Sequence, residues 1–191
     1  MEKSHRVPWF PAWGIRFREP IDDPMEVVAL FNEWRPNERW LLMAFDVAAS
    51  EVHLWTVWHA LRRREISESM TSRAPDTEFL RILSGTHQIR TAFERAGLTS
   101  GDEKAWIVHI PELEIGDGFA NIEIPREIFN DNTKEFERLQ LHLKASLVVQ
   151  RPRPSNEGLV RIGVRNNGDE ISFEHIENAF LNHAAMADMH G

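Results

Sequence analysis

The sequence predicts an α+β fold, in which a small mixed or antiparallel sheet is flanked by helices within a single domain. Two apolar runs have the character of strands, Trp40–Phe45 and Lys104–Ile110. Around them, apolar residues recur every three to four positions, which is the period of an amphipathic helix. A chain of 191 residues buries roughly 70% of its unfolded surface, which is enough for an extensive core.

The N-terminal third opens with a strand and a helix. Apolar and charged residues alternate over Trp13–Arg18, as expected for a half-buried strand. Asp22 or Asp23 can cap a helix that has Pro24 in its first turn and ends near Trp34. The continuous apolar run Trp40–Phe45 then suits a central strand.

Three helices are expected in the next third. Ala48–Arg64 has an apolar stripe of helical period and closes on a run of three arginines, where cations complement the helix dipole. Asp76 offers a cap for a helix through Leu83, and Ser84-Gly85-Thr86 interrupts it. The buried stripe of the following helix is predicted from the spacing of four residues, and Gly97 is predicted as its left-handed stop. The four residues are Ile89, Ala92, Phe93 and Ala96.

The C-terminal half has weaker patterns. Trp106, Val108 and Ile110 alternate in the strand that begins at Lys104. Beyond it we expect a helix, two strands and a terminal helix. These are Arg126–His142, then Leu147–Gln150 and Leu159–Val164, then Ser172–Met189.

Composition limits the class of function. The chain has no cysteine, no apolar run near the ~18 residues of a membrane span, and no apolar segment of signal-peptide type at its N-terminus. A cytoplasmic protein without membrane contact is therefore expected. The net charge of −8 argues against general nucleic-acid binding. Residues 62–95, however, carry seven arginines against five acidic residues, so this region alone is basic.

No catalytic constellation is evident, which favours a binding role and predicts no cofactor and no metal. Ser84-Gly85-Thr86 could present amides to an anion, although a tight helix–helix corner is the simpler interpretation. Trp9 and Trp13 are the only tryptophans that we expect to be free to stack on a base. A cluster at the C-terminus suggests a metal site as the alternative. It consists of His183, Met186, Met189 and His190.

One segment resembles a known family. Glu78-Phe79-Leu80, Leu83-Ser84-Gly85, Gln88-Ile89 and Gly97-Leu98 follow one another before a predicted strand, and a helix containing Val52-His53 precedes them. This order resembles the small regulatory subunit of the KEOPS (EKC) tRNA-modification complex, in its archaeal type. The resemblance covers residues 40–110 and extends weakly to the last helix, and it marks residues 116–165 as a probable insertion.

The resemblance implies an accessory subunit that is not an enzyme. Members of the family bind and activate a small atypical kinase-ATPase directly, and contact the threonylcarbamoyl transferase through it. They also help to bind tRNA, in archaeal-type complexes at its CCA end, for threonylcarbamoyl-adenosine modification. No metal or cofactor is implied.

Two surfaces are the candidates for these contacts. An apolar patch on the terminal helix could bind the kinase, and an outward face of the 76–97 helix pair is a second possibility. The patch consists of Ile176, Ala179, Phe180 and His183. Its apolar members could equally fill the core. The tRNA candidates could equally form a solvated basic face. They are Arg62, Arg63, Arg64, Arg73, His87 and Arg90.

The runner-up function is a small soluble metal-binding protein or enzyme that uses the His/Met-rich C-terminus. It predicts stoichiometric metal that His183→Ala removes.

Overall fold

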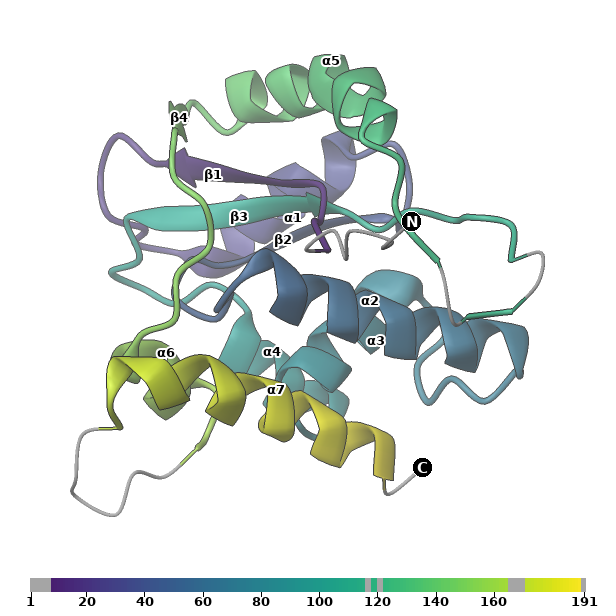
Figure 1. Cartoon of the computed structure of the whole chain (residues 1–191). Coiled ribbons are helices and arrows are strands. Elements are labelled where there is room, and N and C mark those ends of the chain that lie inside the picture. Colours follow the sequence, from purple (N-terminus) through teal and green to yellow (C-terminus); the bar gives the residue numbers. More distant parts are fainter. Residues whose placement is uncertain (1–7, 116–117, 120–121, 165–170, 190–191) are drawn as a thin grey trace.

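A four-stranded antiparallel sheet, with strand order β2-β3-β1-β4, separates two groups of helices (Figure 1). The computed structural model describes residues 8–115, 118–119, 122–164 and 171–189. The strands are β1 Ala12–Arg16, β2 Trp40–Ala44, β3 Lys104–His109 and β4 Ser146–Val148. The helices are α1 Pro24–Trp34, α2 Glu51–Ile66, α3 Pro75–Leu83, α4 Ile89–Ala96, α5 Glu127–His142, α6 Asn156–Arg161 and α7 Phe173–Met189. The predicted α+β class, with an antiparallel sheet flanked by helices, is confirmed.

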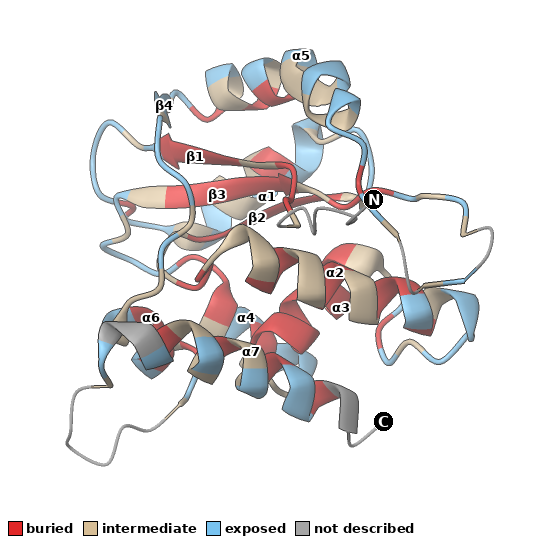
Figure 2. Ribbon diagram, viewed as in Figure 1, coloured by how far each residue is buried: buried red, intermediate tan, exposed pale blue. Residues whose placement is uncertain are grey.

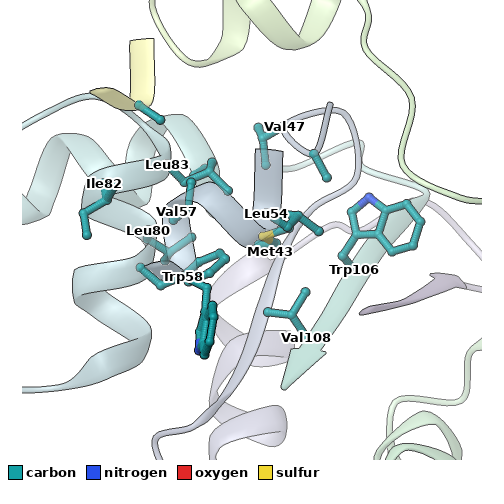
Figure 3. Packing of buried hydrophobic residues seen from close by; sticks show 14 of the residues in the cluster. Met43, Val47, Leu54, Val57, Trp58, Leu80, Ile82, Leu83, Trp106 and Val108 are labelled. Carbon is teal, nitrogen blue, oxygen red and sulfur yellow. The ribbon is translucent and has the colours of Figure 1, made fainter. Parts of the chain in front are cut away.

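Each face of the sheet has its own core because successive residues of a strand point to opposite faces. Trp13 and Ile15 of β1 belong to the cluster covered by α1 and α5. Trp106 and Val108 of β3 face the other way, toward α2 and α3, in the packing drawn in Figure 3. Buried residues therefore run along the sheet and through α2 and α3, whereas α5 and α7 are exposed on their outer sides (Figure 2).

Capping residues set the helix starts in the first half of the chain. Asp23 caps α1 by accepting from the backbone N–H of Met25 at 2.8 Å. Ser50 caps α2 through the N–H of His53 at 3.0 Å, so this helix begins at Glu51 rather than at Ala48 as expected. All five residues of β2 are buried, as its continuous apolar sequence predicts.

Three local predictions are wrong. Leu159–Val164 is not a strand, since α6 forms there with Ser155 as its cap and Gly163, at φ +87°, just beyond its end. Asp76 does not cap α3, because the helix already begins at Pro75 and places Asp76 inside its first turn, where the carboxylate pairs with Arg35. Gly97 ends α4 with φ −75°, outside the left-handed region. A Cβ there would lie 2.5 Å from the Phe93 carbonyl oxygen, which explains the glycine without a positive φ.

The stretch expected to be an insertion, residues 116–165, supplies α5, β4 and α6. β4 extends the sheet beside β1, and α5 covers one face through Phe136 and Leu139. α6 packs on the opposite side, where a Cβ on Gly158 would meet the ring of Phe180 in α7 at 2.8 Å. None of the helices in the described ranges combines the length and the apolar character that a membrane crossing requires.

Candidate functional site

The segment with the family resemblance folds into α3 and α4 around a buried ion pair. Glu78 and Arg81 are completely buried. The Nε of Arg81 donates to one carboxylate oxygen of Glu78 at 3.0 Å, and its Nη2 donates to the other. The backbone N–H of Ser72 also donates to Glu78 at 3.0 Å, while Nη1 of Arg81 donates to the Thr86 carbonyl at 3.2 Å. The pair therefore ties the segment before α3 to the corner after it.

The charge state of Glu78 follows from these donors. Burial alone would raise the pKa of its carboxyl group. The hydrogen bonds from Arg81 and from Ser72 outweigh burial, so the pKa of Glu78 lies below its ordinary value. The carboxylate is ionised at neutral pH and compensates the charge of Arg81 inside the core.

Two of the predicted tRNA-binding arginines are buried in ion pairs. Arg62 is 6% exposed, pairs with Glu65 and donates to the Leu113 carbonyl at 3.0 Å. Arg64 is equally buried, lies 3.7 Å from Glu78 and donates to the Ala187 carbonyl in α7 at 3.0 Å. These two side chains join α2 to its neighbours and present no surface to an RNA.

The remaining four candidates are exposed. Arg63 lies at the end of α2, Arg73 before α3, His87 in the corner before α4, and Arg90 in α4. Arg90 pairs with Glu94 one turn later at 2.9 Å. The Glu78–Arg81 pair holds two of these segments, because it binds Ser72, next to Arg73, and Thr86, next to His87. Arg73 and His87 are thereby held beyond opposite ends of α3.

The predicted kinase-binding patch on α7 is mostly turned inward. Ile176 and Phe180 are 4% and 0% exposed and belong to the core cluster under α2 and α3. Ala179 is half-buried. Ile176 and Phe180 match the alternative in which the apolar residues fill the protein's own core, so these two side chains offer no surface to a partner.

His183 fixes α7 to the corner between α3 and α4. Its Nε2 lies 2.8 Å from the Ser84 carbonyl oxygen and 2.9 Å from the Ile162 carbonyl oxygen. Because both oxygens can only accept, Nε2 carries a hydrogen and donates it to them. Burial lowers the pKa of His183, and these hydrogen bonds oppose that effect. Gly85, at φ +60°, lies against the ring, and a Cβ there would approach Nε2 to 2.5 Å. The Ser84-Gly85-Thr86 segment is thus a tightly packed corner.

An exposed apolar pair lies on α4. Ile89 and Phe93 are 40% and 46% exposed, although their spacing predicts a buried stripe. Ala92 and Ala96 alone face α3, and both are fully buried. This short helix therefore carries two neighbouring apolar stripes, one of large residues and one of alanines. The alanine stripe is the buried one, because a small side chain lets α4 pack closely on α3.

The C-terminal histidine–methionine cluster does not assemble in the described residues. His183 is committed to two carbonyls, and Met186 is exposed. His190 and the side chain of Met189 lie outside the described part of the chain. Among the residues that the structure describes, no group of three histidine or acidic side chains is placed to hold a metal ion.

The two tryptophans expected to be free for base stacking are buried. Trp9 is 7% exposed and donates its Nε1–H to the Ile124 carbonyl at 2.6 Å. Trp13 is 4% exposed and stacks on Phe129 and Phe136 of α5. Both rings are thus largely covered by neighbouring side chains.

An ion-pair hub that the sequence did not predict lies at α6. Arg161 reaches Asp102 at 2.7 Å, Asp46 at 3.1 Å and the Gly97 carbonyl at 2.9 Å. Burial raises the pKa of Asp46, while for Asp102 the hydrogen bonds from Arg161 and Thr99 outweigh burial and lower it. The hub connects α6 to the loops at the ends of β2 and α4, which is a structural role. No local sequence signal links residues so far apart.

Comparison with known proteins adds no identification. Neither the protein-family models nor the curated proteins contain a match to this chain.

Proposed function

We propose that this protein is the small regulatory subunit of a KEOPS-type tRNA-modification complex, works in the cytoplasm and has no catalytic activity of its own. It binds and activates the atypical kinase-ATPase, reaches the threonylcarbamoyl transferase through that kinase, and helps to bind tRNA, including its CCA end.

The observation that carries the proposal is the exposure of the Gln88-Ile89 part of the family-like motif. Most other motif residues, such as Glu78 and Leu83, are buried and are explained by folding. Gln88 and Ile89 are exposed, as is Phe93 one turn later, so folding does not account for the apolar character of Ile89 and Phe93. An exposed apolar pair with charged residues beside it is typical of a protein–protein interface.

The kinase-docking surface is therefore proposed on α4 rather than on α7. Burial of one large apolar side chain contributes about 1.5–3 kcal/mol, and each 1.4 kcal/mol changes the dissociation constant about tenfold. Phe93→Glu should weaken kinase binding at least about tenfold. Leu141→Glu is the matched control because Leu141 is 75% exposed on α5, on the other side of the sheet. Equal binding by the two folded variants in a calorimetric titration would exclude α4 as the docking surface.

The tRNA contact is proposed on two of the exposed arginines, Arg73 and Arg90. Arginine binds phosphate through paired hydrogen bonds, and its contribution declines as salt rises. The net charge of −8 predicts weak affinity for the isolated chain, so tRNA binding is measured with the assembled complex. Arg73→Glu should reduce tRNA retention and its salt dependence, whereas Arg153→Glu, an exposed control, should not. Identical retention by both variants would remove these arginines from the interface.

A further inference from the structure

A groove of about 640 Å³ opens between β1 and α5, beside the end of β4. Its volume lies within the ~300–1,000 Å³ range of ligand-binding clefts. On the α5 side its wall is aromatic, with the ring centroids of Phe129 and Phe136 lying 4.6 Å and 5.2 Å from that of Trp13. The segment that follows β4, from Val149 to Arg151, forms the opposite wall. The three elements enclose a space that borders the edge of β1.

The edge of β1 is only partly paired. The carbonyl of Pro11 accepts from His109 at 3.1 Å and the N–H of Phe17 donates to Glu103, so odd-numbered residues of this strand direct their backbone groups at β3. Even-numbered residues therefore direct theirs at β4. Gly14 and Arg16 have partners there, but Ala12 has none in the β1–β4 register.

The chain turns away at the point where a partner for Ala12 would follow. The N–H of Gln150 donates to the carbonyl of Val148, two residues earlier, at 2.9 Å, and this bond ends the strand. The N–H and C=O of Ala12 therefore face the groove. One donor and one acceptor, set side by side on an extended strand, are the recognition groups that a further β-strand satisfies.

Two polar features indicate what else the occupant carries. The Nε1–H of Trp13 is a buried donor without a hydrogen-bond partner among the described residues. Arg126 lies where α5 begins and places its guanidinium 4.8 Å from the centre of the Trp9 ring. No ion pair of Arg126 with a carboxylate is present in the described part of the chain. This end of the groove thus favours an anionic group.

We propose that the groove binds an extended peptide segment of a partner protein as an added strand on β1. The peptide runs antiparallel to β1, as β4 does, so its carboxyl-terminal end lies at Trp9 and Arg126. Alternate side chains are apolar and pack on Trp13 and the α5 phenylalanines, and an acidic group follows at the Arg126 end. The main-chain pair on Ala12 selects a peptide over a small apolar molecule, because a peptide backbone supplies the matching acceptor and donor. The site goes beyond the proposed function and lies on the other side of the sheet from α4.

The absence of cysteine allows a site-specific test. In Val149→Cys the new thiol is placed at the rim of the groove, where Val149 is 94% exposed. A disulfide attaches the C-terminally amidated peptide acetyl-Cys-Thr-Val-Thr-Val-Glu-amide, in which Glu carries the only negative charge, and the tether supplies a millimolar effective concentration. Hydrogen exchange of the Ala12 amide, followed by NMR, should slow at least about tenfold relative to the same variant capped with free cysteine. A peptide N-methylated at every amide after its cysteine should give no such protection.

Each result decides the proposal. Protection by the unmodified peptide alone supports an added strand. Equal protection by both peptides overturns it in favour of a cleft that takes any apolar molecule, and no protection by either overturns it altogether. Arg126→Glu should abolish the protection given by the Glu-ended peptide while sparing its Gln-ended counterpart, and Arg153→Glu should affect neither. An unchanged response in Arg126→Glu would overturn the acidic end.

Discussion

Removing the charge of Glu78 should destabilise the fold more than any surface change in α3 or α4. In Glu78→Gln, Arg81 remains completely buried without the ionised carboxylate that it binds, and Arg64 loses the negative charge 3.7 Å away as well. Breaking a buried ion pair from one side costs about 3–5 kcal/mol, against a total stability of about 5–15 kcal/mol for a domain. The expected fall in melting temperature is about 2–4 °C for each kcal/mol.

Urea unfolding followed by tryptophan fluorescence measures this loss. The matched control is Glu94→Gln, which removes the same charge from an exposed pair with Arg90 and should cost less than about 0.5 kcal/mol. Because the pKa of Glu78 is lowered in the folded state, its contribution is complete above its ordinary pKa of 4.5 and is lost as the pH falls through the folded value. A stability of Glu78→Gln within 1 kcal/mol of the parent protein would refute the role given to this pair.

Three further predictions concern α7 and its contacts. Gly85→Ala should lower the free energy of unfolding by about 1–3 kcal/mol through its positive φ, and by more through its contact with His183. The same change should therefore cost less in a His183→Ala background, and additive effects in a double-mutant cycle would contradict this. Phe180→Ala should cost about 3–5 kcal/mol in urea unfolding, whereas Val160→Ala, an exposed control, should change stability by less than about 0.5 kcal/mol. Burial and the nearby His183 lower the pKa of His53 to about 3, so the free energy of unfolding should fall as the pH drops from 6.5 toward 3. The same dependence of stability on pH in His53→Asn would show that His53 is not its cause.

The sequence predicted the strands and the long helices because their patterns are long enough to be distinctive. β2 is continuously apolar and fully buried, and α5 spans Glu127–His142 against the expected Arg126–His142. The error at Leu159–Val164 arose where β-branched residues outweighed the cap at Ser155 and the stop at Gly163. In a helix of six residues, those two end signals carry more information than the apolar pattern between them.

The site was harder to predict because it depends on which of two adjacent faces is buried. In α4, Ile89 and Phe93 share the helical spacing with Ala92 and Ala96, and the spacing alone does not show that the alanine pair is the buried one. The arginine run at the end of α2 poses the same problem, since Arg62 and Arg64 donate to the carbonyls of Leu113 and Ala187 in distant segments, which the run itself does not reveal.

The central claim is that this chain binds and activates an atypical kinase-ATPase. The most direct test is a calorimetric titration of the chain with the kinase-ATPase encoded in the same genome, together with its ATPase rate. The account predicts one-to-one binding in the submicromolar range and a raised ATPase rate. Two folded proteins that do not bind, with an unchanged rate, would contradict it.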